Sequence, residues 1–426
     1  MKKITYILLI VLAGLSISCE KFLDAPEKST VDNELIFSNP ELTEEAIVGI
    51  LQPMGNVNFR GRYLTHYGGN TDIEWFNSST SINDRSDLCR YVNSTTNGDM
   101  NTLNNVFGEM YVGIERANIC IAGIREYGQP EPGNEMGQLL GEALTYRAVY
   151  YADLAKTWGD VPARFEPMTE STIYIAKSSR DVIYKQIIAD LEEAAKLVAW
   201  PNETARTTTV EHVNKAFVKG LRARVCLAAA GFSQRASGIK RSSDPDLSVN
   251  TLYPIALQEC KDVIANGTAQ LENTFEGLFR KNCLENTSAG GESLWEIPFA
   301  DGRGRFLYTF GVKHNKPDQY TGQGQGGIFG PLPNVYYDFD AKDTRRDVTC
   351  VPYRWGDPSN NIASQELVGL NTWYFGKWRY EWMTRRVTSG NDDGLNKMYM
   401  RYAEIILMAA EIENELNGPA AAAPYL

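Results

Sequence analysis

The chain has 426 residues, of which 43% are hydrophobic and 22% are charged, and its formal net charge is −11. These fractions are those of an ordinary globular protein, and the length suffices for two or three domains or for one large domain with insertions. The negative charge argues against a nucleic-acid partner, because phosphates would be repelled and no basic run offsets that repulsion.

The N-terminus predicts export. Two lysines follow Met1, an apolar run extends from Ile4 to Ile17, and Ser18 precedes Cys19. This order is typical of a secretory signal peptide over residues 1–18, and the run is too short to span a bilayer, which takes about 20 residues. A cysteine directly after the small residue is where bacterial lipoproteins are acylated. We therefore expect lipidation at Cys19 and a tether over residues 19–33, the alternative being an ordinary signal peptide with an incidental cysteine.

Apolar residues recur at spacings of three and four through much of the middle of the chain, which predicts amphipathic helices. A short helix is expected at 41–51, followed by loop composition over 55–105. The strongest patterns then cover 106–121, 140–158, 183–198, 213–228 and 255–264. Gly159 and Gly267 mark two helix ends, and Ser178 is expected to begin the helix that contains Asp181.

The fold class that follows is mostly α. The paired helices with alanine at close-packing positions predict a TPR-like scaffold over residues 34–267. Over residues 284–381 the helical period disappears, and Gly, Pro, Asn and aromatic residues predict an irregular domain of loops and short strands, for example at 293–299. A helix is expected again at 400–416. We place residues 268–426 in a C-terminal region that stops early in a further helix, and expect it to be shortened.

No catalytic, metal or cofactor motif emerges. The histidines, His66, His212 and His314, are far apart and form no H-E-x-x-H. Residues 322–327 satisfy G-x-G-x-x-G formally, but no strand precedes them and Gly-Pro follows where a helix should begin. Residues 338–343 lack the glycine and the terminal glutamate of a calcium loop. We therefore expect a protein that is not an enzyme and has no metal or cofactor.

Short motifs in a fixed order carry a family resemblance. They are Cys19, Phe22-Leu23-Asp24, Pro26, Glu115-Arg116-Ala117-Asn118, Glu142, Tyr146-Arg147-Ala148, Gly159-Asp160-Val161-Pro162, Tyr184, Asp190-Leu191, Phe339, Asp343, Arg345 and Arg401-Tyr402-Ala403-Glu404. From Cys19 to Leu426 this set resembles the SusD/RagB family of outer-membrane nutrient-binding lipoproteins, although members usually continue through an Asn-x-x-Arg segment.

The resemblance implies a TPR-like scaffold beneath an irregular aromatic-rich domain. It also implies a place on the outer face of the outer membrane of a glycan-degrading Gram-negative bacterium. The ligand would be a glycan, and the partner would be a SusC-like TonB-dependent barrel transporter, to which the lipoprotein delivers the glycan. Two alternatives stay open: the same scaffold could bind peptides, or it could serve only as a structural lid of the transporter.

Most of the matched residues have an expected structural role. Arg147 and Asp160 should hold helices and the Gly-Asp-x-Pro turn, and Arg401 and Glu404 should pair with each other at i,i+3. The tryptophans Trp158 and Trp295 are expected in the core, as are the cysteines Cys120, Cys226 and Cys260.

Eight Trp and 22 Tyr bring the aromatic content to 11%, which suits both cores and binding surfaces. Sugar sites pair flat aromatic rings with polar side chains, because a sugar has apolar ring faces edged by hydroxyls. The segment 70–77 has that mixture in the region where family members often place a ligand-stacking tryptophan. The predicted ligand-binding residues are Trp75 with Asp72 and Asn77, then Tyr320 with Gln323 and Gln325, and then Tyr353, Arg354 and Trp355.

Overall fold

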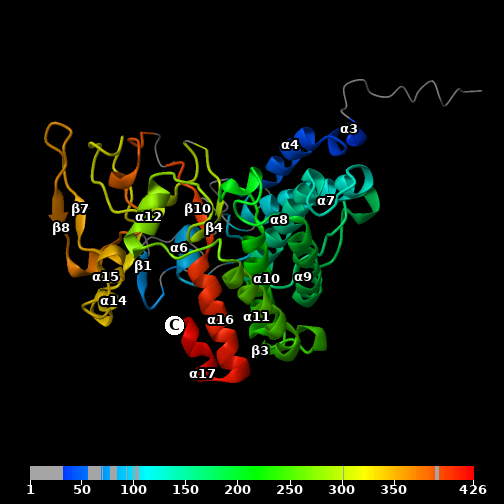
Figure 1. Ribbon diagram of the computed structural model, residues 1–426. Helices are drawn as coiled ribbons and strands as arrows, with labels where there is room; N and C mark the ends of the chain where they lie inside the picture. The colour runs from blue at the N-terminus through cyan, green and yellow to red at the C-terminus, as the bar shows by residue number, and fades with distance from the viewer. Residues whose placement is uncertain are drawn as a thin grey trace, which may run out of the picture.

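The computed structural model describes residues 32–55, 69, 71–76, 84–92, 94–98, 100, 105–300, 302–388 and 393–426. The predicted signal peptide, Cys19, the motif residues 22–26, His66 and Asn77 lie outside these ranges. Figure 1 shows long helices gathered on one side of the molecule and an irregular region of loops, short helices and short strands on the other. The prediction of a mostly α fold is therefore confirmed.

In the described part of the chain, seven helices form the scaffold, and each packs against the helix before or after it in this series. α4 packs on α7, and contacts then run α7–α8, α8–α9, α9–α10, α10–α11 and α11–α16. This is the neighbour-on-neighbour order that the helix-pair pattern predicts. The bounds are α4 Pro40–Leu51, α7 Val106–Tyr127, α8 Glu135–Trp158, α9 Arg180–Leu197, α10 Lys215–Ala230, α11 Val249–Asn266 and α16 Tyr402–Asn417. The short helices α3 (Asn33–Phe37) and α17 (Pro419–Ala422) flank the series.

The ends of these helices follow from local chemistry. Asn39 caps α4 by accepting hydrogen bonds from the N–H groups of Glu41 and Leu42. Gly159, after α8, has a φ of +76°, and Gly267, after α11, has a left-handed φ of +73°, so both predicted glycine stops are confirmed. The predicted cap at Ser178 is wrong by one residue. Ser179 is the cap, because its side chain accepts from the N–H of Asp181.

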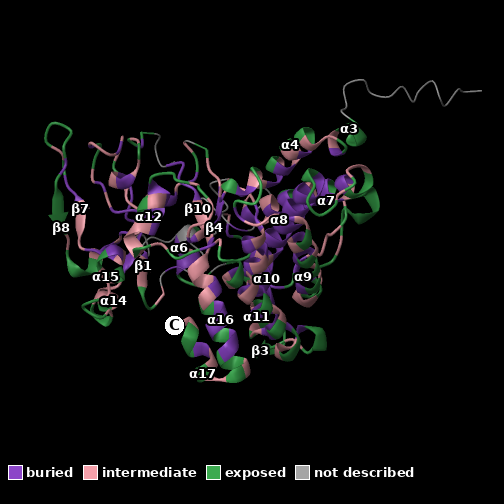
Figure 2. Ribbon diagram, in the orientation of Figure 1, coloured by how far each residue is buried: buried purple, intermediate pink, exposed green. Residues whose placement is uncertain are grey.

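Helix α8 lies at the centre of the scaffold and is buried on almost every side (Figure 2). Its close contact with α7 depends on Gly113, where a Cβ atom would overlap the ring of Tyr150. The side chain of Arg147 is also buried and forms two hydrogen bonds of 2.9 Å with Asp190 of α9. Arg147 further donates to Asn118 and to the carbonyl of Phe165, which confirms its structural role.

The irregular region is built from two-stranded antiparallel ladders between short helices. The strands pair as β1 (Glu74–Phe76) with β5 (Phe329–Pro331), β4 (Ser293–Ile297) with β10 (Lys397–Arg401), β6 (Cys350–Val351) with β9 (Tyr374–Phe375), and β7 (Tyr353–Trp355) with β8 (Gln365–Leu367). A small hairpin, β2 (Ser233–Arg235) with β3 (Gly238–Lys240), extends from the scaffold. The helices are α6 (Asp84–Cys89), α12 (Phe275–Cys283), α13 (Phe306–Phe310), α14 (Pro333–Asp338) and α15 (Arg345–Thr349). The strand expected at 293–299 is confirmed as β4.

Two expectations, one about the pairing of Arg401 with Glu404 and one about Trp158, need correction. Arg401 ends β10 and binds Glu292 at 2.6 Å, while Glu404 binds Arg224 of α10, so Arg401 and Glu404 do not pair with each other. Trp295 is fully buried, as expected, and stacks on Phe217 with ring centroids 4.7 Å apart. Trp158, expected in the core, is only half-buried.

The main hydrophobic core fills the scaffold, and smaller clusters lie within the irregular region. The three cysteines expected in the core, Cys120, Cys226 and Cys260, are indeed buried in this main cluster. All six cysteines of the described part are free thiols. Within the described ranges, no helix combines the length and the apolar character needed to cross a bilayer.

Candidate functional site

Trp75 is held at the edge of the irregular region by strand pairing. It lies in the middle of β1, opposite Gly330 of β5. Its indole N–H donates a hydrogen bond of 3.1 Å to the carbonyl oxygen of Trp373. A Cβ atom at position 330 would overlap that oxygen and crowd the indole nitrogen, so glycine is required there. The ring of Trp75 is therefore fixed in place while half-exposed.

Asp72 lies in the turn just before β1. Its side chain is exposed and makes no hydrogen bond or ion pair with other described residues. An aromatic ring held in place three residues after an exposed carboxylate offers groups that can bind the apolar face and the hydroxyls of a sugar.

The structure brings four of the predicted aromatic residues into one cluster. Trp75, Tyr320 and Tyr353 are half-buried and pack around a small hydrophobic centre that contains Trp355. The rings of Tyr320 and Trp355 have centroids 4.9 Å apart, and Trp355 is only 8% exposed and stacks on His314. Trp355 therefore packs inside the cluster, and its contact with a ligand stays a prediction.

The polar side chains predicted for the site differ in burial and in whether they already make hydrogen bonds or ion pairs within the protein. The hydroxyl of Tyr353 donates to Glu381 and accepts from Arg379. Gln323 is half-buried, whereas Gln325 is buried, with its backbone paired to His314. Arg354 lies on β7 and pairs with Glu366 of β8. The side chains of Tyr353 and Arg354 are thus already engaged within the protein.

His314 and Asp318 fix the loop that carries Tyr320. Both side chains are fully buried, and the Nδ1 atom of His314 lies 2.6 Å from a carboxylate oxygen of Asp318. Burial alone would raise the pKa of Asp318, but the hydrogen bonds from His314 and from the N–H groups of Tyr320 and Thr321 outweigh it and lower that pKa. The buried carboxylate therefore stays ionised and holds the loop in one conformation.

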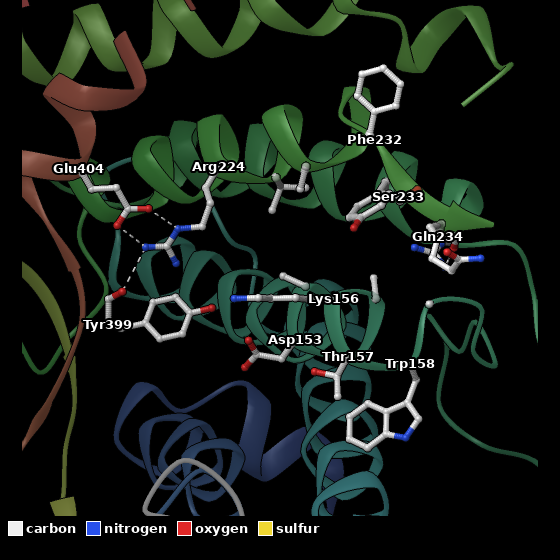
Figure 3. A pocket seen from close by; sticks show the side chains of 17 residues that line it. Asp153, Lys156, Thr157, Trp158, Arg224, Phe232, Ser233, Gln234, Tyr399 and Glu404 are labelled. Atoms are coloured by element: carbon white, nitrogen blue, oxygen red, sulfur yellow. Dashed lines mark hydrogen bonds and ion pairs between the residues drawn. The ribbon is translucent and has the colours of Figure 1, made fainter. Parts of the chain in front are cut away.

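A separate cavity of about 950 Å³ opens in the scaffold between α8, α10, the β2–β3 hairpin and α16. Its lining combines aromatic rings with polar and charged side chains, and the side chains of the lining are drawn in Figure 3. We name this cavity the scaffold pocket. The lining residues used below are Asp153, Lys156, Trp158, Arg224, Phe232, Ser233, Gln234, Tyr399 and Glu404.

Sequence reasoning missed the scaffold pocket, because it treated this part of the chain only as packed helices. A usable signal was present in Gly231-Phe232-Ser233-Gln234, directly after the alanine-rich end of α10. That segment mixes an aromatic residue with small and polar residues, as the segment 70–77 mixes Trp75 with polar residues. Phe232 is 67% exposed at the pocket, so the mixture marks a surface feature and not a core position.

The comparisons with known proteins all find similarity to SusD-like proteins. Residues 21–227 match the SusD-like_3 family model, described as "Starch-binding associating with outer membrane". SusD-like protein P2 of Formosa agariphila is 27% identical over 445 aligned positions, which cover 100% of this chain and 80% of that protein. SusD-like protein P25 of the same organism is 22% identical and covers 96% of this chain and 78% of its own length.

The chain is similar to SusD-like proteins along its whole length. Solved SusD structures share its fold. A SusD homologue from Bacteroides thetaiotaomicron superposes with a TM-score of 0.79 at 19% identity, covering 92% of this chain and 77% of that one. Surface glycan-binding protein A from the same species, in complex with laminarihexaose, superposes with a TM-score of 0.65 at 18% identity, covering 90% and 81%. The expected SusD-like, TPR-like architecture is thereby confirmed.

Proposed function

We propose that this SusD-like protein is a surface lipoprotein that binds a glycan and delivers it to a SusC-like TonB-dependent barrel transporter. The observation that carries the proposal is that Trp75 is only half-buried while a hydrogen bond holds its ring in place, and that the carboxylate of Asp72, three residues earlier, is exposed without a partner among the described residues. A ring that is already ordered loses little conformational entropy when a sugar stacks on it, and this favours binding. The known glycan-binding relative supports the ligand class.

Tyr320, Gln323 and Tyr353 would extend the same site, because the half-buried aromatic residues among them pack around the cluster that Trp75 borders. Trp355 would support the site from within the cluster, and Asn77, which lies outside the described residues, stays a predicted hydrogen-bonding partner of the ligand. The alternatives are a peptide ligand at this site, or a lid subunit without a ligand of its own.

The test is binding of a panel of oligosaccharides, including laminarihexaose, to the wild-type protein and to Trp75→Ala. Loss of one stacked ring should weaken binding by roughly two- to tenfold, since such contacts contribute roughly 0.5–1.5 kcal/mol beyond the area they bury. Trp200→Ala is the matched control, because Trp200 is a half-buried tryptophan on the scaffold. Absence of binding to every glycan in the panel, with intact association to the transporter, would instead favour the lid.

Anchoring is tested separately at Cys19. A Cys19→Ser variant should incorporate no labelled palmitate and should leave the outer-membrane fraction, while the wild-type protein is labelled and stays with it. Labelling of the variant would reject lipidation at this residue. Co-purification of a barrel transporter from detergent-solubilised outer membranes tests the partner directly.

A further inference from the structure

The cationic side chains that line the scaffold pocket differ in whether they have a partner within the protein. Arg224 forms a two-pronged ion pair with Glu404, with oxygen distances of 2.6 and 2.7 Å. Arg180, also in the lining, donates to the carbonyl of Gln234 and lies 3.5 Å from Asp160. These cations therefore already have partners.

Lys156 is different. It lies in the last turn of α8, is exposed, and makes no hydrogen bond or ion pair with any residue of the described chain. In Figure 3 its ammonium group points along the pocket toward the end occupied by Tyr399 and Arg224. The nearby Asp153 also lines the pocket and is only 7% exposed. The lining has three cationic side chains and two carboxylates, so its formal charge is positive although the whole chain has a net charge of −11.

The other end of the scaffold pocket is aromatic and uncharged. Trp158 is half-buried against Phe107, with ring centroids 5.4 Å apart, and Phe232 stands out from the opposite wall (Figure 3). Between them, the hydroxyl oxygen of Ser233 is buried and has no hydrogen-bond partner among the described residues. A buried hydroxyl is normally satisfied, and a ligand hydroxyl in the pocket could do this.

We infer that the scaffold pocket binds an acidic saccharide, a short glycan that carries a carboxylate or a sulfate group. Its anionic group lies at Lys156, a ring face packs on Phe232 and Trp158, and a hydroxyl bonds to Ser233. The cavity of about 950 Å³ is at the upper end of the range for small-ligand sites, so it has room for more than one sugar ring. This site uses none of the residues proposed for the Trp75 site.

The test is isothermal titration calorimetry with defined probes. They are trigalacturonate for a carboxylate, a sulfated carrageenan tetrasaccharide for a sulfate, neutral maltotriose and maltotetraose as size matches, and a tri-glutamate peptide. We expect at least one acidic saccharide to bind more tightly than the neutral sugars. Its affinity should fall as salt rises from about 0.05 to 0.5 M, because exposed charge interactions are screened.

Two substitutions locate the binding. Lys156→Met should weaken binding of the acidic probe by about two- to fivefold, the scale of one exposed charge contact, and Lys156→Arg should retain binding. Lys177→Met is the matched control, since Lys177 is another exposed lysine without a partner in the described chain and lies outside the pocket. Phe232→Ala should weaken binding by a similar factor, whereas Tyr174→Ala, at a residue 95% exposed elsewhere, should not.

The outcomes separate this inference from the glycan site at Trp75. Trp75→Ala should leave the acidic probe bound, and Lys156→Met should leave any neutral glycan at Trp75 bound. The inference is overturned if neither acidic saccharide binds the folded wild-type protein, or if the tri-glutamate peptide binds as tightly as the sugars. It is also overturned if Lys156→Met and Phe232→Ala bind the acidic probe like their controls.

Discussion

Glu296 provides a sharp test of the electrostatics of the core. It lies in β4 and is 3% exposed, and its carboxyl group accepts hydrogen bonds from Ser293 at 2.8 Å and from Asn282 at 3.2 Å. It has no ion-pair partner within the described ranges. Burial, with a smaller contribution from the carboxylate of Glu211, raises the pKa of Glu296 from 4.5 to about 7, despite the hydrogen bond from Ser293.

The sign of the resulting pH dependence follows from proton binding. Between pH 4.5 and about 7, the folded protein keeps a proton on Glu296 that the unfolded chain has released. The folded state binds more protons, so this residue makes the free energy of unfolding fall as the pH rises through that window. The difference between the two pKa values corresponds to roughly 3 kcal/mol, at about 1.4 kcal/mol for each pKa unit.

The substitution Glu296→Gln removes the titration while keeping the shape. The amide oxygen can accept from Asn282, and the amide nitrogen can donate to the hydroxyl of Ser293. In urea unfolding at pH 5, 6, 7 and 8, the variant should match the wild type near pH 5 and exceed it by up to about 3 kcal/mol at pH 8. Glu411→Gln, on the exposed face of α16, is the control for the change of side chain. A difference between Glu296→Gln and wild type that stays constant across this range would refute the reasoning.

Three further outcomes follow from the scaffold. Arg147→Met leaves the carboxylate of Asp190 buried without its cation and should cost about 3–5 kcal/mol in urea unfolding, part of which Arg147→Met/Asp190→Leu should restore. Gly159→Ala forces a Cβ onto a residue with φ +76° and into the guanidinium of Arg180, and should lower the unfolding free energy by roughly 1–3 kcal/mol in a thermal melt. Burial raises the pKa of Cys226 to about 12, so this thiol should stay unreactive to a disulfide reagent at pH 8 until the protein is denatured.

The helical scaffold could be predicted from the sequence because its signals are local. The apolar period that runs through residues 106–264 depends on neighbours three and four positions away, and the glycine stops depend on one residue each. Errors at this level are small, such as the cap at Ser179 in place of Ser178. The burial of Trp295 was predictable for the same reason, since it lies within an apolar strand.

The candidate sites could not be predicted to the same depth, because their contacts are long-range. The indole of Trp75 donates to a carbonyl 298 positions away, and no periodicity in the sequence encodes that pairing. Composition could select Trp75, Tyr320, Tyr353 and Trp355 as candidates, and the fold brings them into one cluster. Composition could not show that Trp75 is only half-buried whereas Trp355 is buried.

The prediction that Arg401 pairs with Glu404 was wrong because the two residues do not lie on the same helix. The two residues are one turn apart in sequence, but the chain changes from β10 to α16 between them. Arg401 therefore faces Glu292, next to β4, while Glu404 faces Arg224 on α10. The junction is fixed at two points, one toward the irregular region and one toward the scaffold. Because Arg224 and Glu404 also line the scaffold pocket, the same ion pair that joins α16 to α10 shapes one end of that pocket and leaves Lys156 as its available cation.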